Sequence, residues 1–321
     1  MLLTILIVQI AIPLVLLGWL WVFPAGSLSG LVLQIAGVGV FLFALARVAQ
    51  WAVPVWWLPL VYGALWLAAS ALAISLRPGI DPLPIWPSGG LAWIATAFAL
   101  TLTAAGLWFS AQALRGRAPP PVEVVEIGNP FGAGQFLVAS GGSQPIVNAH
   151  MRTLDTSIER YRAWRGQSYA VDFFGLGPWG LRATGWRPAN PAAYAIFGAP
   201  LVAPCDGTVV AAEGGMPDFD VPDEDPVNRL GNHVILNCGG AEIVLAHMRQ
   251  GSITVEAGES VTEGSPLGQV GNSGASTEPH LHIHAQRPAA PGAAPISGDP
   301  LGLRIDGRIL VRGDRLMGRA G

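Results

Sequence analysis

Four long apolar runs occupy the first 114 residues of this 321-residue chain. Each run is about as long as the roughly 20 residues that a helix needs to cross about 30 Å of hydrocarbon. The same region holds only three charged side chains, Arg47, Arg77 and Asp81. The sequence therefore predicts a four-helix transmembrane region over residues 1–114. The runs cover residues 2–23, 29–50, 54–76 and 89–114.

The composition of these runs favours a membrane anchor over a channel. No acidic residue or histidine lies inside them to mark a transport path. The first run lacks a basic start and an obvious small-residue cleavage site, so we expect a retained helix rather than a signal peptide. Tryptophans gather near the ends of the runs, as interfacial anchors do; they are Trp19, Trp21, Trp51, Trp56, Trp57 and Trp86.

The arginines give a weak indication of membrane orientation. With four spans, both ends of the region lie on one side of the membrane. Arg47, Arg115 and Arg117 fall on that side, and Arg77 falls on the other. The positive-inside rule then places the C-terminal domain in the cytoplasm.

The chain changes character at Arg115. Residues 115–130, "RGRAPPPVEVVEIGNP", read as a proline-rich linker. Residues 131–321 then contain short runs such as "GTVVAAEGG", "GNHVILNCGG" and "HLHIHAQ", bounded by Gly, Pro, Asn and Asp. Since helices do not alternate with these strands, we expect an all-β domain with an antiparallel sheet. The net charge of −3 and the lack of a basic cluster argue against nucleic acid as a partner.

The chain has two cysteines, Cys205 and Cys238, and both fall at predicted strand edges. They are either a disulfide or two small buried residues. A disulfide would indicate an oxidising, extracytoplasmic location.

Three of the six histidines alternate within the segment "TEPHLHIHAQ". On a β-strand, side chains two positions apart share a face. His280, His282 and His284 therefore point to one side, while the residues between them can cover a core. Imidazole is the commonest metal ligand and the usual proton carrier near neutral pH, so this pattern indicates a metal or catalytic site.

Other candidates for a zinc site lie elsewhere in the predicted domain. A zinc ion needs three or four N, S or O ligands, and a catalytic site keeps one position open. His247 in "VLAHM", His150 in "VNAH" and Asp172 in "YAVDFFG" supply suitable groups. His233 directly precedes an apolar strand, and we expect it to be structural.

The stretch "LAHM" followed by "GESVTEGSPLGQVGNSGASTEPHLHIH" resembles the lysostaphin and LytM type of zinc metallopeptidase. "APCDGTVVAAEGG" and "GNHVIL" fit the preceding strands, so the resemblance covers roughly residues 130–287. The resemblance implies a compact antiparallel β domain with an open groove. It also implies one zinc ion per chain and cleavage of peptide cross-links in bacterial peptidoglycan.

The resemblance also assigns roles to single residues. It makes Asp172 and His282 zinc ligands, and it makes His247 and His280 the catalytic histidines at the water. His284 stands where the family often has another polar residue. We expect it to support the metal ligands from behind or to be exposed.

One position departs from the family pattern. The first family motif is His, three residues, then Asp, but the chain has "SYAVD", with Ser168 in place of the histidine. Three outcomes follow. His150 supplies the missing ligand from a neighbouring strand, with the intervening segment looping out. Alternatively, a water fills the place and zinc binds weakly. In the third outcome the site is degenerate.

Together these features predict a membrane-anchored zinc endopeptidase that acts on peptidoglycan, with His150, Asp172 and His282 as metal ligands. The expected location is the bacterial inner membrane, with the domain on the extracytoplasmic side. The arginine pattern disagrees with this orientation. The main alternative is a catalytically degenerate domain that binds cell wall or activates another hydrolase. Two others are a zinc hydrolase of non-wall peptides and a sensor or transporter whose function lies in the helices.

Overall fold

The computed structural model describes residues 2–75 and 82–319, so Arg77 and Asp81 lie outside the described residues. The chain divides into two compact units, Met1–Leu114 and Arg115–Gly321.

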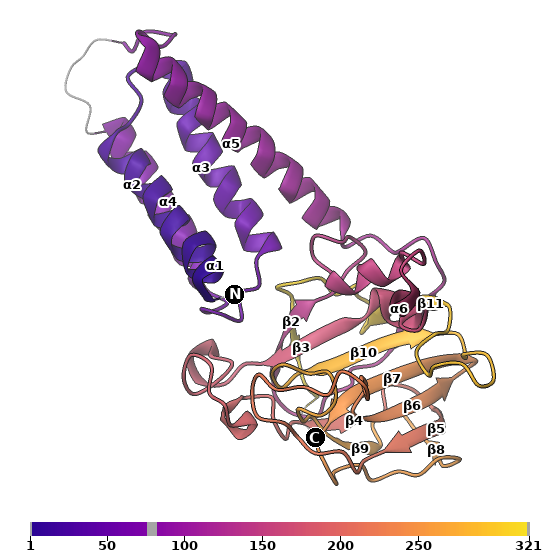
Figure 1. The fold of residues 1–321 in the computed structure, drawn as a ribbon. Helices are drawn as coiled ribbons and strands as arrows, with labels where there is room; N and C mark the ends of the chain where they lie inside the picture. Colours follow the sequence, from indigo (N-terminus) through magenta and orange to yellow (C-terminus); the bar gives the residue numbers. More distant parts are fainter. Residues whose placement is uncertain (1, 76–81, 320–321) are drawn as a thin grey trace. The chain divides into compact units, whose positions relative to one another are not determined.

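The first unit contains only helices among its described residues (Figure 1). Four continuous helical stretches are long and apolar enough to cross a membrane: Leu3–Val22, Leu28–Val48, Leu58–Ser75 and Gly90–Arg115. Their elements are α1 (Leu2–Leu6), the π-helical turn η1 (Ile7–Ala11), α2 (Ile12–Val22), α3 (Leu28–Val48), α4 (Leu58–Ser75) and α5 (Gly90–Arg115). These helices confirm the apolar helical region predicted from the four runs.

Small residues bring α3 and α5 together. A Cβ atom at Gly37 would lie 2.7 Å from the Ala99 carbonyl oxygen, and one at Gly106 would lie 2.9 Å from Val40 Cγ1. Close backbone approach at glycine is typical of helix packing in membranes. The buried Gln34 amide binds the carbonyl oxygens that close α2, so its polar atoms are satisfied.

The second unit is built on a large, mainly antiparallel sheet, which confirms the predicted fold class. The strand order along its main path is β12-β2-β3-β10-β7-β6-β5-β8 (Figure 1). β11 adds to β10, and β1 pairs with β11 in parallel. β4 and β9 form a separate two-stranded sheet.

The strand bounds follow the short runs read from the sequence. They are β1 (Val124–Ile127), β2 (Gln135–Ser140), β3 (Val171–Gly175), β4 (Pro200–Val202), β5 (Gly207–Glu213), β6 (Asn232–Cys238), β7 (Ala241–Met248), β8 (Ser260–Val261), β9 (Pro266–Gln269), β10 (Leu281–Gln286), β11 (Pro300–Ile305) and β12 (Arg315–Met317). β1 falls inside the segment expected to be a linker, so that segment takes part in the domain from Val124 onward.

The two faces of this sheet have different chemistry. On β10, Leu281 and Ile283 are fully buried in the main apolar core. The period of two turns the alternate side chains, His282 and His284, to the opposite face. The sheet therefore fixes the direction of the histidines through the burial of their neighbours.

Short helical turns lie between β2 and β3. They are η2 (Ala149–Leu154), α6 (Glu159–Arg162) and η3 (Arg165–Tyr169). Two further turns, η4 (Pro178–Gly180) and η5 (Pro191–Ala193), precede β4. The segment 151–167, expected to be an insertion, folds into 3-10 and α-helical turns between β2 and β3.

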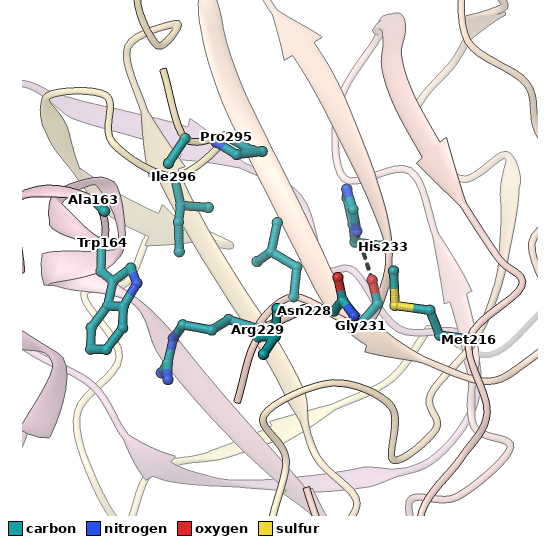
Figure 2. A pocket seen from close by; sticks show the side chains of 12 residues that line it. Ala163, Trp164, Met216, Asn228, Arg229, Gly231, His233, Pro295 and Ile296 are labelled. Atoms are coloured by element: carbon teal, nitrogen blue, oxygen red, sulfur yellow. Dashed lines mark hydrogen bonds between the residues drawn. The ribbon is translucent and has the colours of Figure 1, made fainter. Parts of the chain in front are cut away.

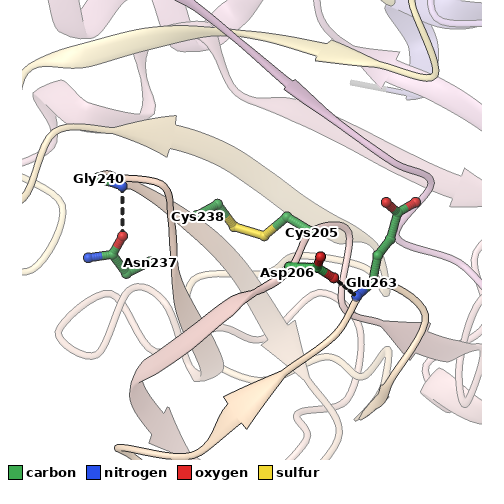
Figure 3. Close-up of a disulfide and its surroundings, with 6 residues drawn as sticks. All are labelled: Cys205, Asp206, Asn237, Cys238, Gly240 and Glu263. Atoms are coloured by element: carbon green, nitrogen blue, oxygen red, sulfur yellow. Dashed lines mark hydrogen bonds between the residues drawn. A yellow bond between two sulfur atoms is a disulfide. The ribbon is translucent and has the colours of Figure 1, made fainter.

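Cys205 and Cys238 form a disulfide (Figure 3). The bond joins the segment just before β5 to the end of β6, with a sequence separation of 33. Closing a loop of this size contributes about 3–4 kcal/mol in the chain-entropy account. Of the two alternatives left open by the sequence, the structure contains the disulfide.

Candidate metal centre and catalytic histidines

Two of the expected ligands are placed opposite each other by strand pairing. Asp172 on β3 and His282 on β10 are register partners in an antiparallel ladder. Directly opposed residues in such a ladder share a face. The Nδ1 atom of His282 lies 3.0 Å from Oδ1 of Asp172.

His150 completes the group from η2. Its Nε2 atom lies 3.3 Å from Oδ2 of Asp172. One ligand atom from each of His150, Asp172 and His282 lies within 4.8 Å of the others. Ligands of a tetrahedral zinc ion lie about 3.4 Å apart, since Zn–N and Zn–O bonds are near 2.1 Å. The donor set and its spacing therefore fit zinc.

Asn148 holds the His150 ring. It caps η2 by accepting a hydrogen bond from the His150 backbone N–H, and its Oδ1 lies 3.1 Å from His150 Nδ1. With a proton on Nδ1 donated to Asn148, the Nε2 lone pair is free for a metal. The Asn148 amide group donates to Gly142 and Ala170, which fixes its orientation. The sequence signal is present in "VNAH", because Asn directly before a helical turn is typical of an N-cap.

The Ser168 side chain makes its hydrogen bonds to groups other than the metal ligands. Its hydroxyl lies 2.8 Å from the Thr153 hydroxyl and donates to the Arg165 carbonyl oxygen. The side chain is fully buried in η3. Of the three outcomes considered for this position, the geometry favours the one with His150. His150 lies in the 3-10 turn η2 rather than on the neighbouring strand expected from the sequence.

His247 and His280 lie side by side next to this group. Their ring centroids are 4.6 Å apart, and His280 Nε2 lies 3.9 Å from Asp172 Oδ1. Each Nδ1 atom faces a carbonyl oxygen, that of Ser273 for His247 and that of Glu278 for His280. Donation through Nδ1 leaves both Nε2 atoms available for proton transfer.

The backbone at His247 is unusual. Its φ angle of 63° lies in the left-handed region, which is uncommon for residues other than glycine. Its backbone N–H does not pair with a neighbouring strand of the sheet and instead donates to the Leu230 carbonyl oxygen. Such conformations cost about 1–3 kcal/mol and cluster at functional sites. The conformation places the His247 ring beside that of His280.

Burial, with repulsion between neighbouring histidines, keeps the imidazoles of His150 and His247 neutral. Burial lowers the pKa of His150 to about 4, against the pull of Asp172. Burial also lowers the pKa of His247 well below its usual value. For Asp172, burial raises the pKa, but the nearby histidines, led by His150, outweigh burial and hold the pKa well below the usual value. A neutral imidazole and an ionised carboxylate are the forms that bind metal.

The site is open on one side. His150, Asp172 and His280 keep 15–17% of their side-chain surface exposed, whereas His282 keeps 4%. The metal group is therefore partly accessible to solvent. A catalytic rather than a closed structural site needs such access.

His284 is fully buried behind His282. Its Nδ1 lies 3.0 Å from Nε2 of His282. If His282 uses Nδ1 for the metal, its Nε2 carries the proton and donates to His284. Of the two roles expected for His284, the structure fits support of a ligand rather than exposure.

We expect His284→Ala to weaken zinc binding by about 10–100-fold, the usual cost of losing a hydrogen-bond partner of a metal-bound histidine. Competition with a chromogenic zinc chelator measures this. His284→Gln, whose amide oxygen can accept the same bond, should recover part of the affinity. Unchanged affinity in both variants would rule out this role.

His233 stands apart from the cluster. It begins β6, is buried, and its Nδ1 lies 2.8 Å from the Gly231 carbonyl oxygen. The structural role expected from the sequence agrees with this position.

Residues 192–293 match the family model of Peptidase family M23. The match confirms the resemblance read from the sequence. The matched segment contains His247, His280 and His282, while His150 and Asp172 precede it. No curated protein matches the chain.

Several solved structures are similar to parts of the chain. The catalytic domain of the antimicrobial peptidase lysostaphin from Staphylococcus simulans is 20% identical, with 51% of this chain and 81% of that chain covered and a TM-score of 0.25. A putative peptidase M23 from Pseudomonas aeruginosa is 20% identical, with 64% and 60% covered and a TM-score of 0.28. A zinc-containing peptidase from Vibrio cholerae is 16% identical, with 47% and 49% covered and a TM-score of 0.22. The chain thus spans less than two thirds of the latter two proteins.

Proposed function

We propose that the C-terminal domain is a zinc metalloendopeptidase that hydrolyses peptide cross-links of peptidoglycan. The observation that carries the proposal is the convergence of one ligand atom from each of His150, Asp172 and His282 within 4.8 Å of one another. His150 Nε2 and His282 Nδ1 are the atoms that face the Asp172 carboxylate. The family match over residues 192–293 supports the reaction class. The complete donor set favours this function over a degenerate, cell-wall-binding domain.

The roles of the residues follow from their geometry. His150, Asp172 and His282 would hold one zinc ion, which when bound supplies a Lewis acid that lowers the pKa of water toward about 7 and polarises a carbonyl group. His280 and His247, whose Nδ1 atoms each face a carbonyl oxygen, are placed to accept a proton from the attacking water through Nε2. The same proton then passes to the leaving amine as the amide C–N bond breaks. Water is consumed, and a carboxylate and an amine are formed.

Purified sacculi test the substrate directly. Full-length protein in detergent with added zinc should release new amino groups from sacculi, and a chelator should stop the release. The new amines can be counted by labelling and located by mass spectrometry of the fragments. Sacculi left intact, with a peptide substrate of other origin cleaved, would show a metallopeptidase with a different substrate.

We further propose that the four apolar helices anchor the domain in the bacterial inner membrane and that the domain faces outward. The disulfide between Cys205 and Cys238 supports an oxidising compartment. Arg47, Arg115 and Arg117 favour the opposite orientation. We give the disulfide and the substrate more weight because three arginines make a small charge bias.

A tag fused after Gly321 should be digested by protease added to intact spheroplasts. The same protein should migrate as the disulfide form on a non-reducing gel after thiols are blocked. A tag that is protected until the membrane is broken would place the domain in the cytoplasm.

A further inference from the structure

A pocket of about 240 Å³ lies on the histidine face of the sheet, outside the metal centre. Figure 2 shows Trp164 and Arg229 at one end and His233 and Met216 at the other, with Ile296 along one side. Ligand pockets for drug-sized molecules have about 300–1,000 Å³. This smaller pocket has room for about one amino-acid side chain.

The floor of the pocket belongs to the same face as His282. Leu230, Ala246 and Ile296 form an apolar cluster against which Trp164 packs. Ala246 on β7 is the register partner of His282 on β10. His233, which lines the pocket, is on β6, two strands from β10, so at about 4.8 Å per strand the pocket lies roughly 10 Å from the metal group. An extended peptide spans that distance with about three residues.

The aromatic end of the pocket carries an arginine, Arg229, that forms no ion pair with any described residue. The Arg229 guanidinium lies 3.9 Å from the centre of the Trp164 ring. Its Nε atom is buried and has no hydrogen-bond partner within the described part of the chain. A half-buried charge of this kind is costly unless it is paired.

The surroundings add positive charge. Arg152 and Arg160 both repel the Arg229 charge, and Glu224 is the one acidic group with an opposing effect on it. The planar fork of a guanidinium matches a carboxylate with two parallel hydrogen bonds. Stacking on Trp164 holds the fork in a fixed plane.

We propose that this pocket is a specificity subsite for a peptide residue that has an aliphatic stem and a terminal carboxylate. The apolar floor contacts the stem, and Arg229, stacked on Trp164, binds the carboxylate. The inference rests on the proposed function, because the bound peptide is taken to be the substrate of the neighbouring metal centre.

The test measures binding without metal or catalysis. Full-length protein in detergent and chelator is titrated with acetyl-Ala-Glu-Ala-amide and with acetyl-Ala-Gln-Ala-amide, a pair that differs only in the charge of one side chain. We expect the acidic peptide to bind at least about 10-fold more tightly. Arg229→Gln should reduce this preference to less than about 2-fold, and Arg304→Gln, on β11 and paired with Glu126, should leave it unchanged.

A second variant keeps the test decisive if Arg229→Gln does not fold. Trp164→Leu retains the charge but removes the stacking surface, and a several-fold smaller preference is expected. Equal binding of the two peptides by the wild-type protein, or a preference that survives both substitutions, would overturn the inference. Because chelator is present, these results are independent of hydrolysis. A protein that shows the preference but cleaves nothing when zinc is restored would refute the proposed function alone.

Discussion

Asp172→Asn is expected to abolish zinc binding and peptide hydrolysis together. Asp172 is the only carboxylate of the metal group, and both His150 and His282 face its oxygens. Asparagine has nearly the same shape but carries no charge. Removing a direct ligand should cost more than the 10–100-fold that is typical for residues behind the ligands.

Zinc content by mass spectrometry and amine release from sacculi measure the two effects. Wild-type protein should hold about one zinc ion per chain after dialysis, and the variant should hold none. Asp299→Asn removes a carboxylate whose side chain is 76% exposed, so it is the matched control and should keep both properties. Stoichiometric zinc in Asp172→Asn would show that the metal lies elsewhere.

His280→Ala is expected to separate catalysis from metal binding. Its Nε2 atom lies 3.9 Å from Asp172 Oδ1, beyond the distance of the closer ligand pairs, and its ring lies beside that of His247. A group that carries a proton in the reaction contributes about 10²–10⁴-fold to the rate. We therefore expect a loss of kcat in this range with zinc retained.

The comparison between the two variants is the informative result. Single-turnover rates on a synthetic peptide, with zinc content measured on the same samples, give both quantities. If His280→Ala loses zinc to the same extent as Asp172→Asn, His280 is a ligand and the assignment of roles is wrong. If it retains full activity, His247 alone carries the proton.

Local patterns were sufficient to predict the parts of the site that lie on strands. The alternation in "HLHIH" places His282 and His284 on one face of β10, because the period of a strand is two; His280 directly precedes the strand. The burial of Leu281 and Ile283 in the core then settles which face is open. The apolar runs likewise predict helices, since only helices and closed barrels satisfy their backbone groups in lipid.

Contacts between segments that are distant along the chain could not be predicted from the sequence. The place of His150 depends on how the turns η2 and η3 fold over the sheet, and no periodic pattern marks such turns. The pocket combines Trp164, Arg229 and Ile296 from three separate segments. To predict the buried contact between His284 and His282, the orientation of both rings has to be known.

The most direct test is anomalous X-ray diffraction at the zinc edge from crystals of the zinc-loaded protein. The account predicts one strong peak in the C-terminal domain, with bonds of about 2.0–2.2 Å to His150 Nε2, an Asp172 oxygen and His282 Nδ1. His247 and His280 should lie outside bonding distance. A peak held by other residues, or no peak from protein that hydrolyses peptide, would contradict it.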